Sequence, residues 1–96
     1  AETLVPRIAA LAMLGREDEA LACAEAARAA FVAAGDERAA GKVELNLGTM
    51  HSRGDRHADA ARWFRSAAVR FARVGDTEHS VMADISLAYA LTWLGD

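Results

Sequence analysis

The sequence has few of the residues that cross-link a chain or carry out chemistry. Cys23 is the only cysteine, so no internal disulfide can form, and none of the histidines His51, His57 and His79 stands at zinc-ligand spacing from it. There is no nucleophile-elbow motif and no phosphate-cradling glycine loop. We therefore expect no metal site, no cofactor and no enzymatic activity.

Charge and hydropathy exclude further classes. The 11 Lys and Arg residues are outnumbered by 14 Asp and Glu, and Lys42 is the only lysine, which is not the basic footprint of a nucleic-acid binder. The longest uncharged stretch near the end, residues 85–95, is about half of what a bilayer crossing needs. We expect no nucleic acid and no membrane as partner, and a cytoplasmic location, because nothing indicates an oxidising compartment.

Alanine and one repeated dipeptide are abundant instead. Hydrophobic residues make up 53% of the chain and 24 residues are Ala, a strong helix former, which predicts closely packed helices. Gly-Asp occurs about every twenty residues, at 35–36, 54–55, 75–76 and 95–96. Because Gly adopts the left-handed conformation that ends a helix, and Asp accepts hydrogen bonds from the N–H groups that begin one, each pair predicts a helix joint. The expected helices are 3–14, 17–34, 37–53, 56–74 and 77–94.

The chain also repeats itself at a spacing of about forty residues. This shift aligns Phe31 with Phe71 and Leu47 with Leu87, as well as the joints at 35–36 and 75–76. The repeating unit is a pair of antiparallel helices, present about two and a half times. Because such a pair cannot bury its own apolar face, the pairs must stack. We expect one all-α domain over 1–96, a helical solenoid, and a piece of a longer chain because no initiator Met is present.

The two central helices each have one predicted buried side. In the fourth helix this stripe is Ala60, Phe64, Ala67, Phe71 and Val74, and the Arg-rich remainder, Arg56, Arg62, Arg65, Arg70 and Arg73, is interpreted as a solvated face. In the third helix Val43, Leu47, Gly48 and Met50 form the apolar side, and Lys42, Glu44, Asn46 and Arg53 the polar side. Gly48 lowers helix propensity, so we expect another helix to cross closely there.

These residues resemble the tetratricopeptide repeat family. The resemblance is carried by Leu47-Gly48, His51, Ala60, Phe64 and Ala67, which have the family's spacing of a Leu-Gly pair, an aromatic, an Ala, a second aromatic and another Ala. His51 replaces the usual Tyr, and a Gly-Asp joint replaces the usual Pro. The longer repeat is similar to that of kinesin light chains and of bacterial multidomain regulators, and we favour a bacterial regulatory or signalling protein.

The resemblance implies a superhelix whose concave groove binds a peptide or helix of a partner protein. It places the groove on the third helix, with Lys42, Leu45, Asn46, Thr49 and Arg53, and on the fifth, with Met82, Ile85, Ser86, Tyr89 and Trp93. Asn46 matches the family branch that binds the C-terminal tails of chaperones, but Val5, Ala9, Met82 and Ser86 replace that branch's other polar groups. The groove is mainly apolar with a basic edge, which suits an amphipathic helix or an extended apolar segment.

Two functions remain open at this point. The first is a scaffold for protein–protein interaction that binds its partner in the groove. The second is a structural spacer or self-association module with no external ligand. Leu91, Trp93 and Leu94 either anchor a ligand or pack against a following helix, and without that helix they leave an exposed apolar end through which a homodimer can form.

Overall fold

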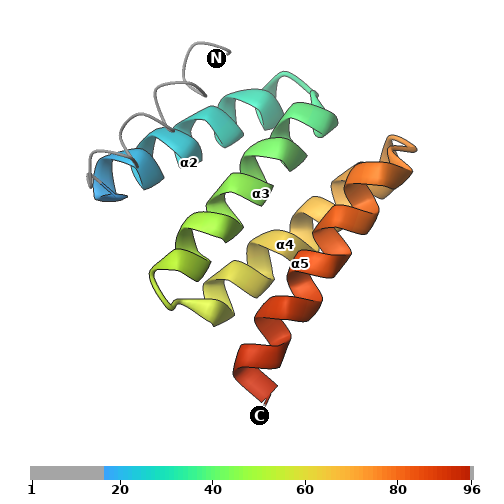
Figure 1. Ribbon diagram of the computed structural model, residues 1–96. Helices are drawn as coiled ribbons and strands as arrows, with labels where there is room; N and C mark the ends of the chain where they lie inside the picture. The colour runs from blue at the N-terminus through green and yellow to red at the C-terminus, as the bar shows by residue number, and fades with distance from the viewer. Residues whose placement is uncertain (1–16, 96) are drawn as a thin grey trace.

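Four helices make up the part of the chain that the computed structural model describes, residues 17–95. They are α2 (Glu17–Ala33), α3 (Glu37–Arg53), α4 (His57–Arg73) and α5 (Thr77–Gly95), and within these residues there is no strand. Neighbours in the chain are neighbours in space: α3 packs against α2 and α4, and α4 also packs against α5 (Figure 1). The predicted all-α architecture is confirmed for this part. The helix expected over 3–14 lies outside the described residues.

Two of the Gly-Asp joints have the predicted structure. Gly35 and Gly75 both have a φ of +74°, in the left-handed region that glycine adopts at little steric cost. Asp36 and Asp76 then each accept a hydrogen bond on Oδ1 from the backbone N–H three residues further on, at 3.1 Å. These bonds satisfy N–H groups that have no partner inside a helix, so each aspartate marks where the next helix begins.

The joint between α3 and α4 differs from the prediction. Gly54 has a φ of −90°, Asp55 takes the left-handed φ of +60°, and Arg56 precedes α4 without a capping side-chain hydrogen bond. The backbone N–H groups of residues 36, 56 and 76 donate to the carbonyls of residues 31, 51 and 71, each at 2.9 Å. All three joints therefore share one hydrogen-bond pattern, repeated every twenty residues. In this pattern Asp55 is equivalent to Gly35 and Gly75, so the Gly54-Asp55 pair lies one residue too early for its aspartate to cap α4. The predicted capping role of Asp55 is therefore wrong.

Small side chains fill most contacts between the helices. The predicted stripe of α4 is buried at four positions, Ala60, Phe64, Ala67 and Phe71, whereas Val74 lies after the last turn of α4 and is 40% exposed. From α5, the fully buried Ala83 and Ala90 pack with this stripe, and Ala20, Ala24 and Ala27 of α2 are fully buried against α3. Placing Val74 in the core was wrong, because the helix ends before it can reach the stripe.

The predicted close crossing at Gly48 is confirmed. A Cβ atom added to Gly48 would lie 2.5 Å from the Phe64 ring, and one added to Gly41, two turns earlier, would lie 3.0 Å from the Phe71 ring. Both phenyl rings of α4 therefore lie against bare backbone of α3. The Phe64 contact is the tighter of the two, and Phe64 is only 4% exposed, so its ring has little room to move away.

We predict that Gly48→Ala lowers the free energy of unfolding. Alanine gains about 1 kcal/mol of helix propensity, but overpacking against a buried ring costs about 1–3 kcal/mol, so the net effect is a loss. Gly41→Ala, in the same helix and with the looser contact, is the matched control and should lose less. Urea denaturation followed by circular dichroism measures both. A Gly48→Ala variant at least as stable as Gly41→Ala would contradict the close crossing.

The polar side predicted for α3 has one exception, because Glu44 is buried. Its side chain is fully inaccessible and lies between two arginines of other helices. Arg28 of α2 donates from Nε to Glu44 Oε2 at 2.6 Å, and Nε of Arg70 on α4 lies 3.0 Å from Glu44 Oε1, an ion pair without the alignment of a hydrogen bond. Glu37 continues the network by accepting from Arg70 at 2.5 Å and from Arg73 at 3.4 Å.

Arg70 was predicted to belong to a solvated face, and this too is corrected. Its side chain is 13% exposed, because it reaches from α4 across to Glu44 and Glu37 on α3. Burial disfavours its charge, but the ion pair with Glu44, and then the charge and hydrogen bond of Glu37, outweigh burial and raise the pKa of Arg70 above its ordinary value. On the other side of Glu44, the Arg28 guanidinium lies 4.9 Å from the centre of the Trp63 ring.

We predict that Glu44→Gln destabilises the fold by about 3 kcal/mol, because removing one partner of a buried ion pair leaves the other charges uncompensated. Glu25→Gln, at an exposed position of α2, is the control and should stay within about 0.5 kcal/mol of the parent chain. Chemical denaturation at neutral pH gives both values. Equal losses in the two variants would show that the buried network contributes nothing to stability.

Candidate functional site

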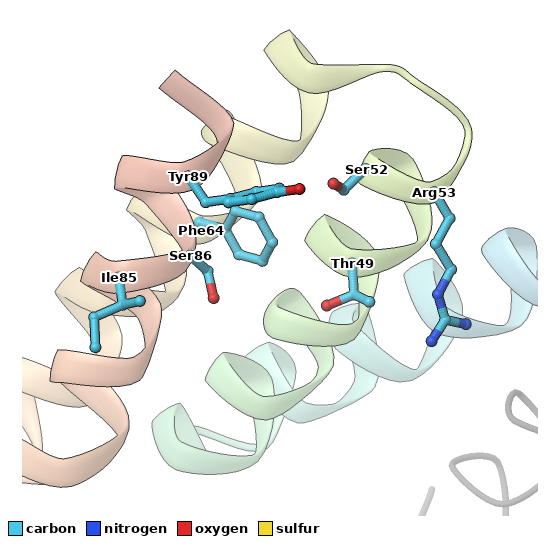
Figure 2. Close-up of a pocket in the computed structure, with 7 residues that line it drawn as sticks. All are labelled: Thr49, Ser52, Arg53, Phe64, Ile85, Ser86 and Tyr89. Atoms are coloured by element: carbon cyan, nitrogen blue, oxygen red, sulfur yellow. The ribbon is translucent and has the colours of Figure 1, made fainter. Parts of the chain in front are cut away.

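A pocket opens between α3 and α5, which run in the same direction because each is antiparallel to α4. Its volume is about 320 Å³. Its lining comes from three helices: Thr49, Ser52 and Arg53 of α3, Phe64 of α4, and Ile85, Ser86 and Tyr89 of α5 (Figure 2). It is a hollow with an aromatic floor and a rim of hydroxyl groups and one guanidinium.

The floor of the pocket depends on the crossing of α3 and α4. Because Gly48 has no side chain, the Phe64 ring lies against the backbone of α3 and reaches the space between α3 and α5. Phe64 also packs with Leu87 and Ala90 of α5 and with Leu45 of α3, and this cluster joins the three helices beneath the pocket.

The structure brings half of the ten predicted groove residues into this one pocket. They are Thr49, Arg53, Ile85, Ser86 and Tyr89. The other five do not line it. Of these, Lys42, Asn46, Met82 and Trp93 are exposed on the same two helices, and Leu45 is half-buried, packing into the apolar clusters beneath the groove.

Two pocket residues were not among the predicted groove residues. Phe64 was assigned to the buried stripe, and it is buried, but one part of its ring forms the pocket floor. Ser52 lies three residues after Thr49, so helical spacing alone could have placed it on the groove side of α3. Figure 2 shows the Ser52 side chain pointing toward the Tyr89 hydroxyl.

The hydroxyl groups of the pocket differ in their availability. Thr49 donates its hydroxyl to the Leu45 carbonyl at 3.0 Å, one turn earlier in α3. Within residues 17–95, the hydroxyl groups of Ser52, Ser86 and Tyr89 form no hydrogen bond, so they are available to a bound molecule. The Arg53 guanidinium likewise has no ion-pair partner in this part of the chain.

Beyond the pocket, aromatic rings continue along α5. Tyr89 and Trp93 meet edge to face with their ring centres 6.2 Å apart, and Trp93 stacks on His57 of α4 at 5.2 Å with the planes 4° apart. Trp93 remains 60% exposed. Its ring is thus held in a defined orientation while one face stays open to solvent, which is how an aromatic anchor for a partner is arranged.

His51, near the end of α3, is partly buried and hydrogen-bonded. Its Nδ1 accepts from Arg56 Nε at 2.9 Å, so this nitrogen carries no proton in the observed arrangement. Burial, and then the positive charge of Arg56, lower the pKa of His51 below its ordinary value of 6.5. The equivalent positions of the other two joints, 31 and 71, hold Phe.

We predict that acidification from pH 7.5 to 5.5 destabilises the parent chain and that His51→Phe reduces this effect. In this range the unfolded chain binds more protons at His51 than the folded chain does, so stability falls as pH drops through 6.5. The Asp76 pKa is lowered by the backbone hydrogen bond from His79, so that carboxylate stays ionised throughout. Urea denaturation at both pH values tests the prediction, and an unchanged pH difference in His51→Phe would contradict it.

The described helices offer neither a metal site nor a membrane span. Residues 17–95 hold no cluster of three or more His, Cys, Asp or Glu side chains that could bind a metal ion. Cys23 is half-buried and packs against the apolar cluster between α2 and α3. None of the helices α2 to α5 is both long enough and apolar enough to cross a membrane.

Comparison with known proteins adds no relative. No protein-family model, no curated protein and no solved structure matches the chain. The pocket is therefore interpreted from its own geometry and chemistry.

Proposed function

We propose that this chain is a protein-interaction scaffold of the tetratricopeptide type, whose groove between α3 and α5 binds a peptide or helix of a partner protein. The observation that carries the proposal is the pocket itself, with an aromatic floor and exposed apolar side chains on one wall. Ile85 is 65% exposed and Tyr89 59%. Large apolar residues gathered at a concave surface mark binding sites, and tyrosine is among the residues that contribute most to binding energy.

The arrangement of the helices supports the same proposal. Helices of 17 residues alternate with joints of three residues, and each packs on its neighbours in the chain. Stacking in chain order is the basis of a solenoid superhelix, and in the tetratricopeptide family the first helix of each pair lines the groove. In this chain those helices are α3 and α5, the two that form the walls of the pocket.

A second candidate function is self-association through α5. Exposed apolar residues lie along much of this helix, yet only its side toward α4 is covered within residues 17–95. Val81, Leu91 and Leu94, which do not line the pocket, are between 42% and 50% exposed. Large apolar surface is usually covered, so a second copy is one way to bury it and form a homodimer.

We predict that Tyr89→Ala weakens binding of a groove ligand about thirtyfold, the loss that corresponds to a hot-spot residue worth about 2 kcal/mol. The ligand is obtained by selecting random dodecapeptides displayed on phage against the 96-residue chain. The selected peptide is then synthesised, and its dissociation constant is measured by fluorescence polarisation. Circular dichroism checks that the variant keeps its helix content.

Val69→Ala is the matched control, because Val69 is 47% exposed on α4 and does not line the pocket. It should leave the dissociation constant unchanged. Equal affinities for the parent chain and Tyr89→Ala would rule out the groove as the binding site. Sedimentation velocity over a range of concentrations distinguishes the second function, which requires a dimer that Leu91→Glu disrupts.

A further inference from the structure

One wall of the groove carries positive charge that the described part of the chain does not use. Lys42, Asn46, Thr49 and Arg53 follow one another along α3 at steps of four, three and four residues, so they share one side of the helix. Lys42 and Arg53 are exposed, and neither has an ion pair or side-chain hydrogen bond within residues 17–95.

Most other basic side chains of this region are engaged. Arg28 and Arg70 bind Glu44, Arg73 binds Glu37, and Arg62 lies 3.5 Å from Asp59. At the start of the groove Arg38 lies 3.2 Å from Asp76, and at its other end Arg56 donates to His51. Arg65, exposed on α4 outside the pocket, likewise has no ion pair or side-chain hydrogen bond among the described helices and so provides a control.

The opposite wall of the groove, on α5, is apolar. Met82, Ile85, Tyr89 and Trp93 recur at steps of three and four residues, and all are at least half exposed. Asp84 stands between Met82 and Ile85 in the sequence but does not have the spacing of this series, and Glu78, one turn before Met82, forms no ion pair with Lys42. One wall therefore offers positive charge and the other offers apolar surface.

We propose that the groove selects an acidic amphipathic segment of a partner protein, with an apolar side chain in the pocket above Phe64 and carboxylates facing Arg53 and Lys42. This inference rests on the proposed function and specifies its ligand. Arg53 lines the same pocket as Phe64 and Tyr89, so an acidic residue close to the anchoring side chain reaches the guanidinium, which binds carboxylates through two parallel hydrogen bonds.

The spacing of the two cations sets the spacing of the acids. Lys42 and Arg53 are eleven residues apart on one helix, which is about 16 Å at 1.5 Å per residue. A partner that binds as a helix needs its acidic residues about eleven positions apart, and one that binds as an extended strand, at about 3.3 Å per residue, about five apart. The acid spacing in selected peptides therefore also reveals the conformation of the ligand.

Both cations are exposed to solvent, so they contribute more to selectivity and association rate than to affinity. Neutralising either one should weaken binding about two- to fivefold. Reversing the charge at Arg53 introduces repulsion and should weaken the binding of an acidic peptide about tenfold or more, an effect that decreases with added salt.

The test uses the dodecapeptides selected on the full 96-residue chain. We expect the peptides whose binding depends on Tyr89 to carry acidic residues beside an apolar one. Arg53→Glu should lose about tenfold in affinity for such a peptide, and replacing the peptide's acids with lysines should restore binding to Arg53→Glu. Arg65→Glu makes the same charge change outside the pocket and should have little effect.

The failure of this inference can be told apart from that of the proposed function. Tyr89-dependent peptides that are neutral or basic, or equal losses in Arg53→Glu and Arg65→Glu, would overturn the acidic ligand and leave the groove as the binding site. If no peptide depends on Tyr89, both the groove and the acidic ligand are overturned.

Discussion

Ion pairs of Glu44 link three of the four described helices, and the geometry of the groove depends on these ion pairs. Its fully buried carboxylate lies on α3 between Arg28 of α2 and Arg70 of α4. Desolvating each ion of such a group costs several kcal/mol, which well-placed partners must offset. A shift of α3 by one turn would separate the carboxylate from both arginines. The network therefore favours a single register between α3 and α4, and with it the position of Phe64 beneath the pocket.

The helices approach closely because their contact surfaces are made of Gly and Ala. Gly41 and Gly48 receive the rings of Phe71 and Phe64, and fully buried alanines face them from the neighbouring helices. Such contacts bury little apolar area for each residue, so large side chains such as Phe71, Phe64 and Leu47 contribute more area each. The aromatic residue that closes the floor of the pocket is thus also one of the main supports of the fold. Substitutions at Phe64 would confuse stability with binding, whereas Tyr89 and Arg53 are exposed and separate the two.

The groove combines a rigid floor with walls that are free to bind. Phe64 and the residues around it are packed between three helices, while Tyr89, Ile85 and Arg53 extend from the backbone into solvent. Trp93 is intermediate, because His57 holds one face of its ring and leaves the rest exposed. Preorganised anchors of this kind reduce the ordering that binding would otherwise require.

Local chemistry in the sequence determined the helices, their order and most of their buried faces. Gly35-Asp36 and Gly75-Asp76 end and begin helices through hydrogen bonds to residues a few positions away, and a stripe with helical spacing, such as Ala60 to Phe71, needs only its own periodicity to be recognised. The assignment of Thr49, Arg53, Ile85, Ser86 and Tyr89 to the groove, by contrast, was implied by the resemblance to the tetratricopeptide family and not by this periodicity.

Only the tertiary structure decided where Glu44 and Arg70 lie, how the joint at 54–56 is formed, and which groove residues share a pocket. Glu44 looks like a surface residue in its own helix, and its burial depends on arginines that are 16 and 26 positions away in the sequence. Asp55 takes the left-handed conformation because the packing of α3 and α4 gives this joint the same hydrogen-bond pattern as the other two, with Asp55 at the position that Gly35 and Gly75 occupy. Phe64 lines a pocket only because Gly48 lets its ring lie against α3. Each of these features requires groups from separate helices to meet, and helical periodicity contains no information about such meetings.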